Sequence, residues 1–318
     1  MYDVVALGEL LIDFAAKSTD AAGYPTMAAN PGGAPGNFLA ALNAYGKKTA
    51  FLGKVGDDAF GHLLLGTLNQ AEIETKGIVV DPTVFTTLAF VTFDESGDRS
   101  FSFARKPGAD TQLTWEEVDK SIIDDAKVFH FGTLSLTDEP VRTTTQKCVA
   151  YAKEKGKLIT CDPNLRKPLW PSGEAAKEQI EWSLNQADVV KISDEDVAFL
   201  WGCTPEEGAD KLLTECGVSL AMVTLGPKGG LLKTANACCM APGPRVSPID
   251  TTGAGDIFGG SAVSRLLDLN KAIAYLTEED LAYIGRFATT SASLSTEHLG
   301  GIPSIQDEAT ILARMAQL

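Results

Sequence analysis

Short apolar runs alternate with helix-like segments along most of the chain. Six runs are strand-like: VVALGELLIDF, TAFLGKVG, KVFHFGTL, KLITCDPN, VVKISDED and SLAMVTLG. This alternation predicts an α/β fold in which a mostly parallel sheet is covered by helices. The first run carries acidic residues and has no basic segment before it, so we interpret it as a first strand and not as a signal peptide.

One stretch departs from this pattern. The sequence LAFVTFDESGDRSFSFA, residues 88–104, alternates apolar and polar positions on both sides of a polar turn, which predicts a half-exposed β-hairpin. Residues 15–30 are small and weakly patterned, and we expect them to supply another strand beside the hairpin. Because no serine- or proline-rich linker divides the chain, we expect one α/β domain over residues 1–318, with an inserted β lid formed from about 12–32 and 86–108.

Composition limits the classes of partner. The 318 residues are 44% hydrophobic and have a formal net charge of -15, which argues against a nucleic-acid groove or an anionic membrane surface as the main partner. No apolar segment approaches transmembrane length. The six cysteines form no CxxC pair, so we expect reduced thiols and a cytoplasmic protein. The scattered histidines His62, His130 and His298 are assigned no chemistry.

The stretch DTTGAGDIFGGS, which begins at Asp250, precedes apolar residues at helical spacing. This places Gly253–Asp256 at a helix N-terminus, where unpaired backbone N–H groups and the helix dipole favour an anion. Asp256 lies at the rim of this anion cradle, where a carboxylate can accept a proton from an attacking hydroxyl. A base beside an anion cradle indicates phosphoryl transfer. The simpler alternative is a glycine-rich helix start in which Asp256 only stabilises the dipole.

A second glycine cluster, NPGGAPGN, precedes the helix-like run FLAALNAYG. Its glycines Gly32, Gly33 and Gly36 would bring the backbone close to a ligand, and the Asn37 amide offers a donor and an acceptor for sugar hydroxyls. Taken alone, the cluster is also compatible with a simple loop. Two other nucleotide motifs are absent from the sequence: there is no GxxxxGK[ST], and Phe258 stands at the third glycine position of GxGxxG.

Polar clusters follow several predicted strands, and in a parallel sheet the carboxyl ends of the strands meet at one cleft. In chain order the motifs GELLIDF, GGAPGN, GKVGDDAFG, DPNLR, KISDED, TLGPKGG and DTTGAGD resemble those of the PfkB, or ribokinase-like, family of sugar kinases. Within that family, GGAPGNF, ARKPGAD and DPNLRKPLW are most similar to fructokinases. The resemblance implies a three-layer α/β/α sandwich with a mostly parallel central sheet and a small β-sheet lid.

The resemblance also implies roles for individual residues. Asp256 would be the catalytic base, and the transferring phosphoryl group would be held by the backbone of Gly253, Ala254, Gly255 and Asp256. The sugar would contact Asp13, Gly32, Gly33 and Asn37. Two cations, Arg105 and Arg166, would orient the sugar or balance phosphate charge, with pairing to a surface acid as the alternative.

For ATP, the resemblance implies a loop and a neighbouring strand end that contain Lys191, Ser193, Thr224, Gly226 and Gly229. Ribokinase-like enzymes often carry Asn-x-x-Glu at the position of residues 193–196, where this chain has Ser-Asp-Glu-Asp, so Asp196 is expected to order magnesium-bound water. Many members of the family bind potassium beside the anion hole. The matching oxygens here belong to Asp250, Thr252 and residues 295–301.

These features predict an ATP-dependent sugar kinase, and among sugar kinases a fructokinase that makes fructose 6-phosphate. A lysine that can follow the paired glycines in the family is replaced by Ala34, which argues against ribose. The alternatives within the family are a 2-keto-3-deoxygluconate kinase and a nucleoside or aminoimidazole riboside kinase. Outside it, we weigh a sugar- or nucleotide-binding sensor without turnover and, more distantly, a dehydrogenase. An isolated two-stranded flap has exposed edges, so we expect a homodimer that pairs through the lid.

Overall fold

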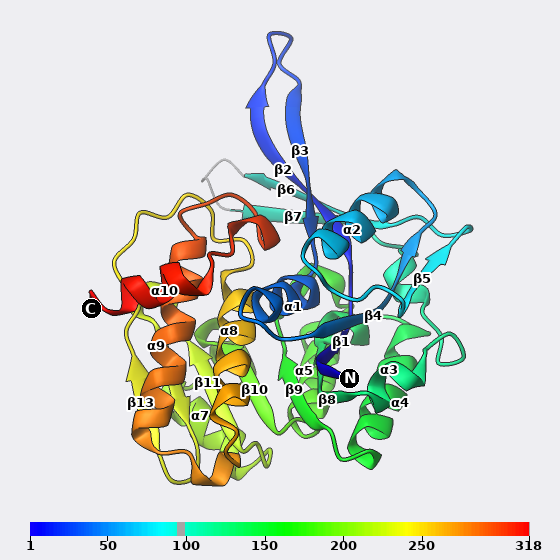
Figure 1. The fold of residues 1–318 in the computed structure, drawn as a ribbon. Coiled ribbons are helices and arrows are strands. Elements are labelled where there is room, and N and C mark those ends of the chain that lie inside the picture. Colours follow the sequence, from blue (N-terminus) through cyan, green and yellow to red (C-terminus); the bar gives the residue numbers. More distant parts are fainter. Residues whose placement is uncertain (94–98, 318) are drawn as a thin grey trace.

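Nine strands form the central sheet of the computed structural model, which describes residues 1–93 and 99–317 (Figure 1). The order across the sheet is β13-β12-β11-β10-β9-β8-β1-β4-β5. Neighbours from β5 to β11 pair in parallel, and β12 pairs antiparallel with both β11 and β13, so the predicted mostly parallel sheet is confirmed. The strands are β1 (Tyr2–Leu7), β4 (Thr49–Gly56), β5 (Ile78–Asp81), β8 (Ala126–Gly132), β9 (Leu158–Asp162), β10 (Val189–Ser193), β11 (Leu220–Thr224), β12 (Gly230–Lys233) and β13 (Cys238–Ala241).

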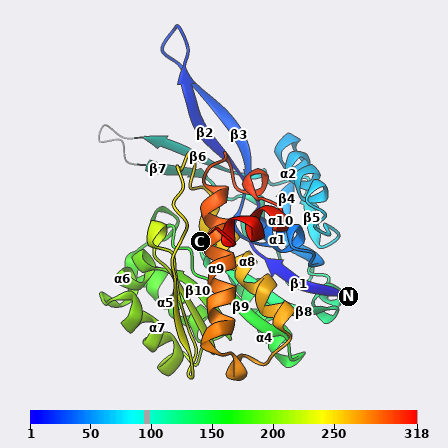
Figure 2. The same cartoon turned by 60° about the vertical axis from the view of Figure 1, so that its left-hand side comes forward.

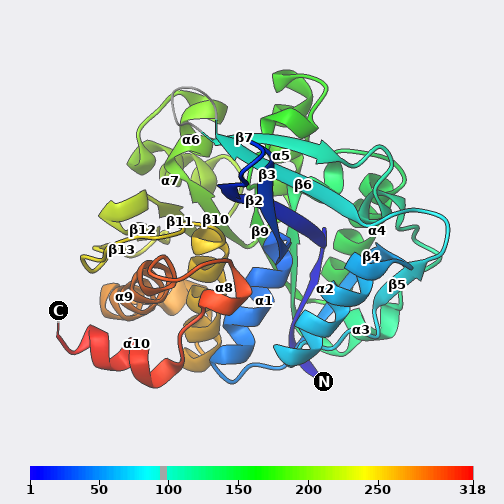
Figure 3. The same cartoon turned by 90° about the horizontal axis from the view of Figure 1, so that it is seen from above.

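Helices cover both faces of this sheet, as seen from above in Figure 3. One face packs against α3 (Lys120–Asp124), α4 (Val141–Glu154), α5 (Gly173–Leu184), α6 (Asp194–Trp201) and α7 (Pro205–Thr214). The other packs against α1 (Ala34–Ala44), α2 (Ala59–Gln70), α8 (Ala254–Leu269) and α9 (Glu278–Ser295), and α10 (Glu308–Met315) lies outside them. None of the helices in the described residues has the length and apolar character that a membrane crossing requires.

The central strand β1 shows how the sheet joins the two helical layers. Its Val5 and Leu7 pack in the same core as Ile180 of α5, whereas Val4 and Ala6 pack with α1 and α2. All four side chains are fully buried, because successive residues of a strand point to opposite faces and both faces are covered here. Such a strand reads as a continuous apolar run, which is the pattern that the sequence carries.

A second, smaller sheet has the order β3-β2-β6-β7, with β2 (Leu11–Thr19), β3 (Pro25–Gly32), β6 (Thr87–Phe93) and β7 (Arg99–Ala104). The β2–β3 hairpin projects away from the sandwich in Figures 1 and 2. The predicted hairpin over residues 88–104 is confirmed by the antiparallel pairing of β6 with β7, although its turn at 94–98 lies outside the described residues. Residues 15–30, expected to supply one further strand, instead supply the end of β2, a turn and most of β3.

The run VVALGELLIDF does not form one strand as predicted. β1 ends at Leu7 and β2 begins at Leu11, so residues 8–10 carry the chain from the central sheet to the small one. Gly8 lies against Pro35, where a Cβ would come within 2.5 Å of the ring, and the buried Glu9 carboxylate accepts a hydrogen bond from the Ala34 N–H at 2.9 Å. The pattern conceals this break because the residues on both sides of it are buried.

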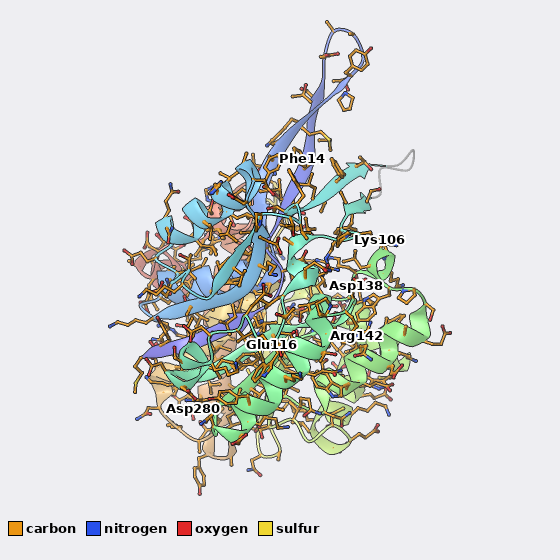
Figure 4. The ribbon with its side chains drawn as sticks, turned by 90° about the vertical axis from the view of Figure 1, so that its right-hand side faces the viewer. Phe14, Lys106, Glu116, Asp138, Arg142 and Asp280 are labelled. Carbon is orange, nitrogen blue, oxygen red and sulfur yellow. The ribbon has the colours of Figure 1, made fainter. Side chains whose placement is uncertain are left out.

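Arg105 directly follows β7, the last strand of the small sheet in the sequence, and its side chain is buried. Its guanidinium donates to the Asp110 carboxylate at 2.8 Å, the Thr137 hydroxyl at 2.6 Å and the Leu134 carbonyl at 2.9 Å. The neighbouring residue Lys106 and the Asp138 carboxylate, which is 3.4 Å from Arg105, are labelled in Figure 4 at the base of the small sheet. Arg105 therefore fastens this sheet to the sandwich.

We predict that Arg105→Met lowers the free energy of unfolding by about 3 to 5 kcal/mol, because it leaves the Asp110 carboxylate buried without its cation. Urea denaturation measures the change. Lys106→Met is the matched control, since Lys106 is exposed and its loss should change stability by less than about 0.5 kcal/mol. An Arg105→Met protein with unchanged stability would contradict this structural role.

Candidate active site

Asp256 lies in the first turn of α8, at the edge of the central sheet where the parallel strands end. The helix begins after Gly253, whose φ of 75° is left-handed and is adopted without strain by glycine. No side chain among residues 1–93 and 99–317 caps this helix start. The predicted arrangement, with a helix N-terminus at Gly253–Asp256, is therefore present, and its backbone N–H groups and positive dipole end can receive an anion.

Asn37 of α1 holds the Asp256 side chain. Its amide Nδ2 donates to Asp256 Oδ2 at 2.9 Å, across 219 residues of chain. Two glycines close around the buried amide: a Cβ on Gly301 would lie 2.2 Å from Asn37 Oδ1, and one on Gly253 would lie 2.9 Å from Asn37 Nδ2. The second glycine cluster of the sequence thus meets the first through Asn37.

The surroundings of Asp256 change its acidity. Burial raises the pKa of its carboxyl to about 6, and the neighbouring Asp162 carboxylate adds to this effect. Lys191, the Asn37 hydrogen bond and Arg166 act in the opposite direction. A carboxyl group with a pKa near 6 is ionised at neutral pH and is a stronger base than an ordinary aspartate, as general-base catalysis requires.

Lys191 lies behind the anion cradle. Its buried ammonium Nζ donates to Asp162 Oδ2 at 2.8 Å, and a Cβ on Gly255 would lie 2.7 Å from the same Nζ. Burial alone would lower the pKa of Lys191, but Asp162 and Asp256 together raise it above its ordinary value. The structure therefore brings Lys191 beside the base, and it does so through Asp162, a residue that sequence reasoning missed although it begins the motif DPNLR.

Arg166 is the cation that faces the acids of the site. Its half-buried guanidinium donates to the Leu165 carbonyl at 3.3 Å and lowers the pKa values of Asp13, Asp196 and Asp256. Arg105, by contrast, is held at the base of the small sheet. Of the two arginines predicted to face sugar or phosphate, the structure brings only Arg166 to the group around Asp256.

The small sheet contributes Asp13, whose pKa burial raises to about 6 while Arg166 opposes the shift. Gly32 lies directly beside this carboxylate, since a Cβ there would come within 2.3 Å of Asp13 Oδ2. Gly33 has a φ of 118° and would meet the Glu9 carbonyl at 2.4 Å if it had a Cβ. Both glycines are therefore required by close approach, Gly32 to the Asp13 carboxylate and Gly33 to the Glu9 carbonyl.

The residues predicted for the nucleotide lie at adjacent strand ends. Ser193 of β10 pairs in register with Thr224 of β11, and the turn after β11 contains Gly226 and Gly229, with φ of 56° and 102°. Ser193 caps α6 by accepting a hydrogen bond from the Asp196 N–H at 3.0 Å. These strand ends lie next to α8, and the Lys191 ammonium between them and the cradle donates to Asp162.

The chemistry of a divalent cation fits the acids at this edge. Burial raises the pKa of Asp196, with a further contribution from Asp162, so the two carboxylates lie close enough to repel each other. The second oxygen of Asp162, Oδ1, is buried without a hydrogen-bond partner in the described structure. Among residues 1–93 and 99–317, however, no three side chains of His, Cys, Asp or Glu gather as a metal-binding cluster. A cation here would take most of its ligands from phosphate and water.

Asp250 joins the start of α8 to the loop after α9. Its Oδ1 accepts from the Thr252 N–H at 3.0 Å and from the Thr252 hydroxyl at 2.7 Å, and its Oδ2 accepts from the Gly300 N–H at 2.9 Å. The two segments predicted to supply oxygens to a monovalent cation, residues 250–252 and 295–301, are thus neighbours.

His130, which is assigned no chemistry from the sequence, is a packed ring of the core. Its ring stacks on Phe38 at a centroid distance of 3.8 Å, and its Nδ1 lies 3.0 Å from the Thr160 hydroxyl. Burial lowers the pKa of His130 to about 3, so the ring is neutral. It lines a pocket together with Asp162, Lys191 and Asp256.

Known proteins resemble this chain over its full length. The tomato protein Fructokinase-2 from Solanum lycopersicum is 40% identical over 305 residues, which cover 95% of this chain and 92% of the relative. The solved fructokinase of Xylella fastidiosa with bound ATP superposes with a TM-score of 0.91 and 29% identity, covering 100% of this chain and 99% of that one.

A fructokinase from Vibrio cholerae O395, solved with fructose, ADP and a calcium ion, superposes with a TM-score of 0.85 and 31% identity, covering 98% of each chain. A double mutant of that enzyme with fructose, ADP and a potassium ion gives a TM-score of 0.86 at 30% identity, again covering 98% of both chains. These likenesses confirm the predicted three-layer fold with its small second sheet. Residues 1–308 match the pfkB family carbohydrate kinase profile, and the chain belongs to this family of carbohydrate kinases.

Proposed function

We propose that the protein is an ATP-dependent fructokinase, which converts ATP and D-fructose to ADP and D-fructose 6-phosphate. The observation that carries this proposal is the hydrogen bond from Asn37 to Asp256, because it joins the glycine cluster suited to a sugar with the anion cradle suited to a phosphoryl group. The sugar itself is inferred from the relatives: the tomato protein is named a fructokinase, and the Vibrio enzyme was solved with fructose and ADP.

In this reaction the Asp256 carboxylate accepts the proton of the fructose 6-hydroxyl while that oxygen attacks the γ-phosphorus of ATP. An oxygen–phosphorus bond forms to the sugar, the bond to the β-phosphate oxygen breaks, and its electron pair leaves with ADP. The N–H groups of Gly253, Ala254, Gly255 and Asp256 stabilise the charge on the transferring group. Their preorganisation at a helix start requires no rearrangement during the reaction.

Four groups position the sugar and the phosphates. The Asp13 carboxylate and the Asn37 amide bind sugar hydroxyls, with Gly32 and Gly33 allowing the backbone to approach. The Arg166 guanidinium faces the acids of the site and balances phosphate charge as the γ-phosphoryl group arrives. Arg105 acts through the base of the lid rather than on the sugar.

ATP binds along the strand ends at Ser193, Thr224, Gly226 and Gly229. Mg²⁺ is the divalent ion we assign, with Asp196 ordering its bound water, and when bound it neutralises phosphate charge. Potassium would lie where the residues held by Asp250 and Thr252 meet the loop at 295–301. The potassium-bound Vibrio double mutant supports this last assignment.

We further assign the small sheet, about residues 12–32 and 86–108, as a lid that closes over the sugar and excludes water. In the described part of the chain no strand pairs with the outer edges of β3 and β7, and pairing lids in a homodimer would protect them. A cytoplasmic location is supported by the six cysteines, all in the described part of the chain and all free thiols.

The proposed fructokinase activity can be tested by an ADP-release assay across a panel of sugars. We expect fructose to give the highest kcat/KM, and ³¹P and ¹³C NMR of the product to place the phosphate on carbon 6. Preference for 2-keto-3-deoxygluconate or for a nucleoside would reassign the protein within the family. Sugar binding without ADP release from any member of the panel would contradict the kinase function.

Asp256→Asn should lower kcat by about 10² to 10⁴, because the amide keeps the size of the carboxylate but cannot accept the hydroxyl proton. Fructose and ATP binding, measured by calorimetry, should survive. Glu174→Gln is the matched control: Glu174 is an exposed first-turn acid of α5, and its replacement should remove about 0.3 to 1 kcal/mol of stability without changing kcat. Near-normal turnover in folded Asp256→Asn would contradict the role of the base.

Lowering the pH should separate activity from stability. Below about pH 6 the Asp256 carboxyl becomes protonated, so kcat/KM should fall about tenfold per pH unit. Meanwhile burial raises the pKa values of Glu9 to about 7 and of Asp13 and Asp256 to about 6, so the folded state binds more protons than the unfolded state between about pH 5 and 7.

Stability should therefore rise as the pH falls through that range, because the three carboxyls outweigh His130, whose lowered pKa acts in the opposite sense. Melting temperatures of the ligand-free protein at pH 7.5 and 5.5 provide the measurement. A melting temperature that falls in parallel with kcat/KM would mean that acid inactivates the protein by unfolding it, against this account.

A further inference from the structure

A buried ion pair lies behind the anion cradle. Lys191 is 8% exposed and Asp162 is 6% exposed, and their charged atoms, Nζ and Oδ2, are 2.8 Å apart. The two residues occupy adjacent positions on the parallel strands β9 and β10, since Cys161 pairs in register with Val190. The backbone of two central strands therefore fixes this pair, and no mobile loop is involved.

Burying a lysine and an aspartate has a large desolvation free energy, and apolar residues of similar volume often give equal or greater stability to the folded protein. The location of this pair suggests what it does instead. Lys191, Asp162 and Asp256 line one pocket, and the space above Nζ is kept open by Gly255, where a Cβ would come within 2.7 Å. The second Asp162 oxygen is buried with no hydrogen-bond partner in the described structure.

We infer that Lys191 and Asp162 are positioning residues for the base: the ammonium keeps Asp256 ionised next to incoming phosphate charge, and Asp162 fixes the ammonium while offsetting part of its effect. This inference rests on the phosphoryl transfer proposed above. It gives Lys191 a role different from direct contact with ATP, because the lysine donates to Asp162 and lies below the cradle backbone.

The groups of the described residues that act on Asp256 come from several elements. Asp162 comes from β9, Lys191 from β10, and Arg166 from the segment after β9. Asn37 of α1 donates a hydrogen bond, and the neutral His130 of β8 lines the same pocket without contributing charge. Asp162 raises the pKa of Asp256, and Lys191, Asn37 and Arg166 lower it, so Lys191 and Asp162 act on the base with opposite sign.

Three variants test the inference through the pH dependence of kcat at saturating fructose and ATP. Lys191→Met should move the acid limb up by about one pH unit, because an opposing charge near the carboxylate is lost. Asp162→Asn should move it down by a similar amount. The double variant removes both charges, so its acid limb should return to within a few tenths of a unit of the wild-type value.

Lys191→Met leaves Asp162 buried alone and is the variant that is most sensitive to misfolding. The double variant leaves no unpaired charge, so together with Asp162→Asn it decides the question if Lys191→Met does not fold. Lys54→Met is the matched control, because Lys54 is another buried lysine, 3.2 Å from Asp81 and 2.6 Å from Glu117, in the strand β4. It should lower the melting temperature and leave the acid limb in place.

Titration of the Asp256 carboxyl by ¹³C NMR, assigned by its absence in Asp256→Asn, measures the same shifts without turnover. A failure of the fructokinase assignment would therefore leave this test intact. Opposite shifts for the single variants and their cancellation in the double variant would support the inference. Unchanged titration of Asp256 in all three variants would overturn it. A KM for ATP that is raised in Lys191→Met and stays raised in the double variant would also overturn it, because it would indicate direct contact of Lys191 with ATP.

Discussion

The hydrogen bond between Asn37 and Asp256 is the contact on which the rest of the site depends. It joins the start of α1 to the start of α8, two helices that lie side by side on one face of the central sheet. Strand β3 of the small sheet connects to α1 through Gly33, and α8 begins after Gly253 of the anion cradle. The hydrogen bond therefore links the lid strands to the cradle. Glycine is required at Gly301 and Gly253 because the Asn37 amide fills the space of their side chains.

Charge is arranged around this contact in an unusual way for a chain with a formal net charge of -15. Asp13, Asp162, Asp196 and Asp256 gather at one edge of the sheet, and only Lys191 and Arg166 among the described cations are seen to act on Asp256. Burial and mutual repulsion raise the pKa values of several of these acids, which makes them better proton acceptors. An acidic protein can therefore receive phosphate, provided that two cations and a helix N-terminus face it.

Much of this arrangement was predictable from the sequence because its signals are local. The helix start at Gly253, the parallel sheet and the hairpin over residues 88–104 follow from spacing and turn chemistry. The break after Leu7 was missed because the leucines on both sides of it are buried, and Gly8 and Glu9 between them did not by themselves mark the change from one sheet to the other. The ion pair of Asp162 with Lys191 and the anchoring of Arg105 were also missed, since each depends on which strands become neighbours.

The central claim is that Asp256 faces the reacting hydroxyl of the sugar while the backbone beside it faces the γ-phosphoryl group. A crystal structure with fructose and a non-hydrolysable ATP analogue tests it most directly. We predict that the fructose 6-oxygen lies about 3 Å from an Asp256 carboxylate oxygen, and that γ-phosphate oxygens face the N–H groups from Gly253 to Asp256. A complex in which another carboxylate contacts the 6-hydroxyl, or in which the γ-phosphate lies away from the start of α8, would contradict it.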